Sequence, residues 1–155
     1  MSRALLAVFL PVLLAACPGR SAEAGARAAQ PADSVPEAVQ VTVELTARPL
    51  HGGDDGGGRV TAQPAAGGVA VQGALSTPNP CYTLHGQARR DGSIVTLTVE
   101  ARAGDGICTQ SIGAFSYDAT VRGLSSGTYE FRVIHTYPDT GWETRPALST
   151  SITIP

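Results

Sequence analysis

Hydrophobic and polar residues alternate along most of the chain from residue 37 onward. The alternation is strongest in residues 39–45, 94–101, 115–121 and 129–133, and weaker runs of the same kind occupy residues 59–63, 69–75, 81–89 and 148–154. A period of two places one apolar face of a strand against a core and leaves the other in water. Six or more such strands with almost no helical period predict an all-β sandwich or barrel.

One hairpin is predicted from local residues alone. Residues 81–89 and 94–101 are two alternating runs, joined by Arg90-Asp91-Gly92-Ser93. The Asp-Gly pair tolerates the positive φ that tight hairpin turns need. We therefore expect one inward face from each strand: Tyr82, Leu84, Gly86 and Ala88 from the first, and Val95, Leu97, Val99 and Ala101 from the second. Further turns are expected at residues 77–80, 125–127 and 138–141.

The first 36 residues differ from the rest. Residues 1–16 combine Arg3 with an apolar run of eleven residues that ends in small side chains. A run this short is typical of a secretory signal, because a membrane-spanning helix needs about 20 apolar residues. Residues 17–36 are rich in Ala, Pro and Gly and predict a flexible tether. Residues 37–155 are then one domain, long enough for a single core.

Leu14-Ala15-Ala16-Cys17 resembles the lipobox of bacterial lipoproteins. The resemblance implies that Cys17 carries lipid and becomes the new amino terminus after cleavage. Two or more acyl chains, palmitate among them, anchor a protein stably. We therefore expect a protein held to a membrane of the cell envelope. In a Gram-negative host this is the outer membrane, on its periplasmic or surface face, since Pro18 stands where Asp would favour the inner membrane.

The remaining cysteines fit export. With Cys17 modified, Cys81 and Cys108 are left, and two thiols in an oxidising compartment predict one disulfide. The alternative is two separate buried thiols. Both cysteines are expected at the same end of the sandwich, because the hairpin after Cys81 returns the chain to that end by about residue 102.

Residues 124–133 resemble the penultimate strand of immunoglobulin-like and fibronectin type III domains. There a Gly-x-Tyr step forms a tyrosine corner, and Gly127 and Tyr129 match it. The resemblance implies an immunoglobulin-like Greek-key sandwich in which the hydroxyl of Tyr129 bonds to the backbone upstream. Pro78-Asn79-Pro80-Cys81-Tyr82, with Cys108 and this step, is also similar to small uncharacterised bacterial lipoproteins.

Charge and histidine spacing argue against several functions. The chain has 11 Arg, no Lys and 13 acidic residues, with no basic block, so no nucleic-acid partner is expected. His51, Asp54 and Asp55 lie in a Gly-rich loop that lacks the ligand spacing of an EF-hand. His85 falls on the outward face of its strand, and His135 is expected as a surface or strand-end residue. No zinc-site spacing is present, and we expect no metal or cofactor.

The glutamates of the strands do not mark an enzyme. Glu44, Glu100 and Glu130 occupy outward strand positions, where solvent exposure is expected and no catalytic pair of carboxylates is indicated. Tyr137 and Trp142 form a candidate recognition surface near the last hairpin, with packing of Trp142 over the end of the core as the alternative.

The sequence thus predicts a non-enzymatic, monomeric envelope lipoprotein whose sandwich binds a protein or glycan or has a structural role. The competing hypothesis is a small secreted hydrolase or metal-binding protein that uses His and Asp residues.

Overall fold

A computed structural model describes residues 41–50 and 58–155 of the protein. Within these ranges the chain forms eight strands and no helix: β1 (Thr42–Pro49), β2 (Thr61–Ala65), β3 (Gly68–Thr77), β4 (Tyr82–Asp91), β5 (Ile94–Ala103), β6 (Gly113–Arg122), β7 (Gly127–Thr136) and β8 (Arg145–Ile154). The predicted all-β class is therefore confirmed.

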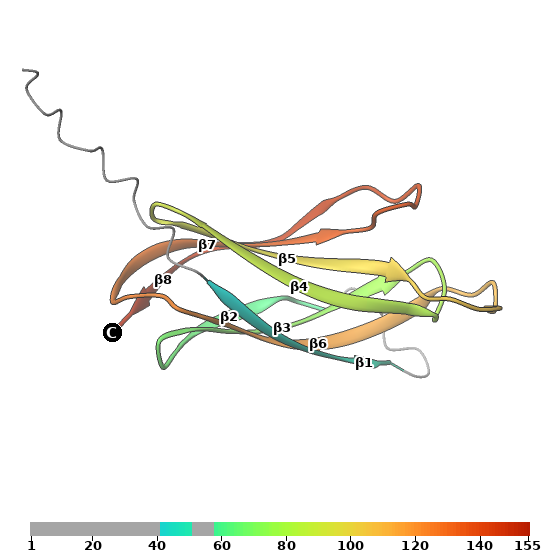
Figure 1. The fold of residues 1–155 in the computed structure, drawn as a ribbon, viewed down its shortest axis with the longest axis horizontal. Helices are drawn as coiled ribbons and strands as arrows, with labels where there is room; N and C mark the ends of the chain where they lie inside the picture. The colour runs from blue at the N-terminus through green and yellow to red at the C-terminus, as the bar shows by residue number, and fades with distance from the viewer. Residues whose placement is uncertain (1–40, 51–57) are drawn as a thin grey trace, which may run out of the picture. The chain divides into compact units, whose positions relative to one another are not determined.

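The strands form two four-stranded sheets that pack face to face (Figure 1). Sheet A has the order β1-β6-β3-β2, and sheet B has the order β4-β5-β7-β8. At one edge β1 contacts β4, and at the other β2 contacts β8. The two sheets therefore enclose one core between them, which is a β-sandwich.

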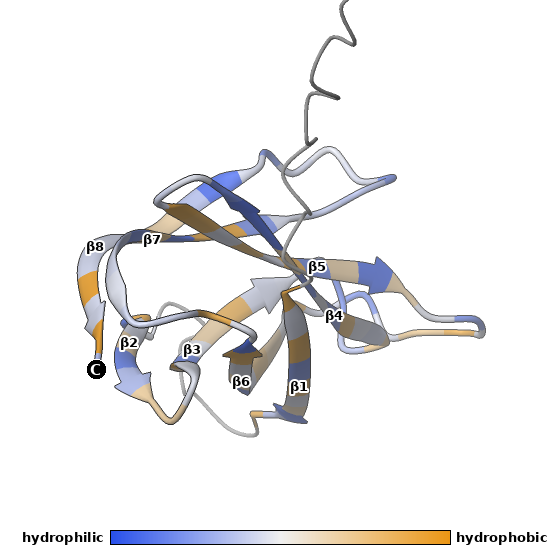
Figure 2. Cartoon of the chain, turned by 60° about the vertical axis from the view of Figure 1, so that its left-hand side comes forward, coloured by the Kyte–Doolittle hydropathy of each residue, from blue (hydrophilic) through white to orange (hydrophobic). Residues whose placement is uncertain are grey.

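The inward positions follow the alternation of the sequence. Val95, Leu97, Val99 and Ala101 of β5 are fully buried, as predicted, and so are Phe131 and Val133 of β7. Bands of high and low hydropathy alternate along the strands in Figure 2. Burial of these apolar side chains is the main favourable contribution to folding, at roughly 25 cal/mol per Å².

The β4–β5 hairpin forms where it was predicted, with a turn one residue later than the Asp-Gly pair indicates. Asp91 pairs with Ile94 in the ladder, so the two loop residues are Gly92 and Ser93. Gly92 has φ of 58°, whereas Asp91 does not adopt positive φ. Glycine at the first loop position is typical of a type II′ turn.

Sheet B contains one parallel pair that the immunoglobulin-like resemblance did not imply. β5 and β7 run parallel, with Val95 opposite Phe131 and Val99 opposite His135. The immunoglobulin fold has two antiparallel sheets. Here β6 lies between the two strands in the sequence and runs back through sheet A, so β7 returns in the direction of β5.

The two ends of the sandwich are distinguished below. The corner end holds Thr42, the Gly92-Ser93 turn and Gly127, as the pairings of Thr42 with Arg122 and Gly127 with Ile154 show. The disulfide end holds the loop between β5 and β6 and the crossing from β3 to β4. The described chain enters the sandwich at the corner end, where β8 also ends (Figure 1).

The proposed leader (residues 1–16), lipid-bearing Cys17 and tether (residues 17–36) lie outside the described residues, as do His51, Asp54 and Asp55. No helix long and apolar enough to cross a membrane occurs in residues 41–50 and 58–155.

Candidate functional site

The disulfide end is tied together by the predicted bond between Cys81 and Cys108. Their Cα atoms are 6.1 Å apart, which is within the usual range for a disulfide. The backbone N–H of Gly104 donates to the carbonyl of Cys81 at 2.8 Å, and the Cys81 N–H donates to Oδ1 of Asn79 at 3.0 Å. These bonds hold the β5–β6 loop against the Pro-rich crossing.

That loop exposes two large apolar side chains. Ile107 is fully exposed and Ile112 is 67 % exposed, and they flank Cys108 in sequence. Sequence alternation did not identify them, because they lie in a loop where no strand period applies. Single exposed apolar side chains are common on protein surfaces. These two isoleucines are candidates for contact because they lie on one cross-linked loop.

The tyrosine corner lies at the opposite end. Tyr129 is buried, and its hydroxyl donates to the carbonyl of Ser125 at 3.0 Å. Gly127 has φ of 151°, and a Cβ added to it would lie 3.8 Å from the Tyr129 ring. The Arg90 guanidinium covers the ring at 5.1 Å from its centroid. The Tyr129 hydroxyl and the Arg90 side chain, which also donates to the Gly92 carbonyl, both have partners, which fits a structural role.

The two histidines of the described chain lie on opposite faces of sheet B. His85 is exposed, and its Nε2 lies 3.1 Å from Oγ1 of Thr83. His135 is buried, at 6 % exposure. His135 is the penultimate residue of β7, so the expected strand-end position is confirmed, whereas the surface alternative is wrong. Its parity with Phe131 and Val133 points it into the core, and this periodicity was the signal that could have placed it.

His135 bonds to Tyr117 of sheet A across the core. The Tyr117 hydroxyl lies 2.9 Å from Nε2 of His135, with the two rings edge to face. Gly73 makes room for this pair, because a Cβ there would lie 2.5 Å from the Tyr117 hydroxyl. Burial lowers the pKa of His135 to about 4 and raises the pKa of Tyr117 well above its usual value. Both groups are therefore neutral at pH 7.

The tautomer of His135 follows from the neutral pair. The Tyr117 hydroxyl has no other partner among the described residues, so its proton is satisfied when it donates to Nε2. The imidazole proton then resides on Nδ1, which is available as a donor to water or to a ligand.

Tyr137 and Trp142 do not form an exposed aromatic surface. Their rings are edge to face with centroids 5.3 Å apart. Tyr137 is buried at 8 % exposure, and Trp142 is half-buried against the core. Thr140 holds the turn between them, donating to the Tyr137 carbonyl at 2.9 Å and accepting from the Trp142 N–H at 3.0 Å. Tyr137 thus contributes to the core, and Trp142 covers it.

A cavity of about 210 Å³ opens beside this aromatic pair. It lies between the second half of β3 and the start of β8, and His135 and Arg145 belong to its lining. The apolar part of the lining consists of Val60, Ala74, Leu75, Tyr137, Trp142 and Ala147. It is the place in the described chain where a buried histidine, aromatic side chains and a cation meet.

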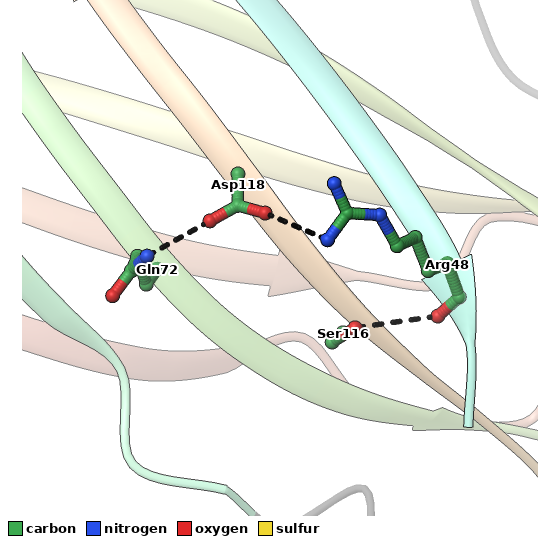
Figure 3. A network of polar contacts seen from close by, with 4 residues as sticks. All are labelled: Arg48, Gln72, Ser116 and Asp118. Carbon is green, nitrogen blue, oxygen red and sulfur yellow. Dashed lines mark hydrogen bonds and ion pairs between the residues drawn. The ribbon is translucent and has the colours of Figure 1, made fainter. Parts of the chain in front are cut away.

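A second hollow, of about 300 Å³, lies on the outer face of sheet A above β2, β3 and β6. Two polar side chains of its lining, Gln72 and Asp118, bond to one another (Figure 3). Asp118 accepts from Gln72 at 3.0 Å and pairs with Arg48 at 3.7 Å. Because these groups are largely exposed, their pairing contributes little stability. They are less suited to a ligand than unpaired groups in the cavity between the sheets.

Three glutamates of the strands pair with arginines. Glu44 pairs with Arg122, Glu130 with Arg132, and Glu100 with Arg102. Across residues 41–50 and 58–155, no group of three or more His, Cys, Asp or Glu side chains is placed to hold a metal ion.

Comparison with known proteins supports the fold. Residues 69–140 match the family model of the ORF11 beta-sandwich domain, a stretch that contains the disulfide and the tyrosine corner. No curated protein and no solved structure matches the chain.

Proposed function

We propose that this protein is a membrane-anchored envelope lipoprotein whose β-sandwich is a non-catalytic module that binds another envelope protein. The observation that carries the proposal is the pair of exposed isoleucines, Ile107 and Ile112, on a loop closed by the Cys81–Cys108 bond. The lipobox-like residues before Cys17 support the anchor, and the leader supports export.

The loop is suited to protein contact because it is already constrained. A flexible loop loses conformational freedom on binding, which weakens the complex. Here the disulfide and the Gly104–Cys81 hydrogen bond restrict the loop before any partner arrives. Two branched apolar side chains on such a loop can enter an apolar pocket with little further ordering.

The loop also lies at the opposite end of the sandwich from the point where the described chain enters it. The described chain enters the sandwich at the corner end, and the loop projects from the disulfide end (Figure 1). The strands between them have up to ten residues, or roughly 33 Å. If lipid on Cys17 holds the protein, the corner end is nearer to the attachment point along the chain, and the isoleucines are free to reach a partner.

Photo-crosslinking in native membranes tests this role. A crosslinker at position 107 should join the protein to one discrete partner, whereas a crosslinker at Thr96, on the outer face of sheet B, should not. Ile107→Asp together with Ile112→Asp should abolish capture, while Thr109→Asp adds charge to the same loop without removing an isoleucine and should preserve it. Equal products from positions 107 and 96 would argue against the loop as the binding surface.

The anchor needs its own test. Mass spectrometry of the mature protein should find an amino-terminal Cys17 with acyl chains, and Cys17→Ser should release the protein from membranes. An unmodified amino terminus at another residue would refute the lipoprotein half of the proposal.

A further inference from the structure

The cavity beside Trp142 exists because β2 is short. β2 pairs only with the first half of β3, from Gly68 to Gln72. Beyond Gln72, β3 has no strand on that side among the described residues. The sandwich edge is therefore open between the second half of β3 and the start of β8, and the cavity lies in this opening.

Three polar groups at the cavity have no hydrogen-bond or ion-pair partner among the described residues. They are Nδ1 of His135, the Tyr137 hydroxyl and the Arg145 guanidinium. No buried side-chain nitrogen or oxygen of the described residues lacks a partner. Because these three groups lack partners, none of them is fully buried, and each is in contact with solvent. For His135 and Tyr137 this contact is limited to the small exposed part of the side chain.

The polar groups at the cavity favour an anionic ligand. Arg145 is a permanent cation, and the His135 tautomer described above presents an N–H donor. Apart from Ser76 the remaining lining is apolar or aromatic, and it includes no acidic residue of the part of the chain that the structure describes. A ligand that matches this arrangement has an apolar body for Trp142 and Leu75 and an anionic acceptor for Arg145.

We propose that this cavity binds a small apolar carboxylate, with the carboxylate at Arg145 and the apolar group against Trp142. The volume of about 210 Å³ lies below the roughly 300–1,000 Å³ of sites for drug-sized ligands, so the ligand must be small. This site is separate from the isoleucine loop, and the inference does not depend on the proposed protein partner or on the lipid anchor.

Trp142 is the sole tryptophan of the chain, so its fluorescence reports on the cavity directly. The full-length protein is titrated with phenylacetate and with phenylacetamide, which has the same shape without the charge. We expect saturable binding of phenylacetate with Kd on the order of 1 mM, as suits so small a ligand. Phenylacetamide should bind at least about fivefold more weakly, because it lacks the charge-assisted hydrogen bond.

Two variants and one control locate the site. Arg145→Gln should remove the preference for phenylacetate, and since Arg145 is exposed the fold should be unaffected. Arg89→Gln, an exposed arginine on the outer face of sheet B, should leave both affinities unchanged. Ala147→Leu should fill the cavity and abolish binding of both compounds.

Three results would overturn the inference. They are no saturable change up to about twenty times the expected Kd, equal affinity for the acid and the amide, or unchanged phenylacetate binding in Arg145→Gln. None of these results bears on crosslinking at position 107, so failure here and failure of the proposed function are distinguishable.

Discussion

The connections between strands are stabilised in different ways at the two ends of the sandwich. At the corner end the connections are short, and their polar groups bond within the connection or to the adjacent turn. Ser93 accepts from the N–H of Glu130 at 2.9 Å, and Tyr129 donates to Ser125. At the disulfide end the connections are longer, and a covalent bond replaces local closure.

This difference indicates which end of the sandwich has side chains that remain available to bind a ligand or partner. The groups of the corner end are paired with one another, so they stabilise the fold and leave little for a ligand. The disulfide end instead retains exposed Ile107 and Ile112 and the unpaired donors of the cavity. The Cys81–Cys108 disulfide, called the staple below, makes these unpaired groups possible. It constrains the unfolded chain and so stabilises an end whose side chains are not all used for packing.

The largest expected effect comes from removing the staple. Cys81→Ala together with Cys108→Ala opens a loop with a sequence separation of 27 residues, which costs about 3–4 kcal/mol in the chain-entropy model. Urea unfolding measures the loss. Amide exchange should show that protection falls in the β5–β6 loop and persists at the Glu130 N–H of the corner end. Equal loss of protection at both ends would mean that the ends are not independent.

Acid should destabilise the disulfide end through His135. Burial lowers its pKa from 6.5 to about 4, so the unfolded chain takes up a proton at higher pH than the folded one. The stability associated with neutral His135 is complete above pH 6.5, is lost as pH falls towards 4, and changes no further below that. The whole loss is about 3 kcal/mol.

Paired variants isolate this histidine from the carboxylates that titrate in the same range. His135→Gln can still accept from Tyr117 and should flatten the stability profile between pH 6.5 and 4 relative to the wild type. His85→Gln, on the exposed outer face, should keep the wild-type profile. Identical profiles for His135→Gln and the wild type would show that His135 is not buried in neutral form.

Gly73→Val should break the contact between the sheets at Tyr117. The added Cβ would lie 2.5 Å from the Tyr117 hydroxyl and 2.6 Å from Cζ, so the ring must leave His135. Overpacking of this kind costs about 2–3 kcal/mol. Gly141→Ala is the matched control, because its Cβ meets nothing within 4 Å, and its effect should stay within about 0.5 kcal/mol. A small effect at both positions would contradict the packing described for Tyr117.

The strands and the staple could be read from the sequence because each depends on a local or pairwise rule. The period of two placed Val95, Leu97 and Val99 correctly, and the expectation of an oxidising compartment for Cys81 and Cys108 predicted the disulfide. The parallel β5–β7 pair could not be found in this way, since strand order depends on contacts between distant residues. The exposure of Ile107 also escaped, because residues of that loop follow no period. The burial of His135 and Tyr137 was predictable, since both continue the inward parity of Val133.

The smallest expected effect is at the tyrosine corner. Removing one tyrosine hydroxyl at each end compares the two ends of the sandwich. Tyr129→Phe removes the hydroxyl that donates to Ser125 and leaves a carbonyl partly buried without that donor. We expect a loss of about 1 kcal/mol in the free energy of unfolding.

Tyr82, at the disulfide end, is also a buried tyrosine. Its hydroxyl has no partner among the described residues and is in contact with solvent. Tyr82→Phe should therefore change stability by less than about 0.5 kcal/mol. If both substitutions cost the same in urea unfolding, the Tyr129 hydroxyl makes no special contribution, and the contrast between a fully paired corner end and a partly unpaired disulfide end is lost.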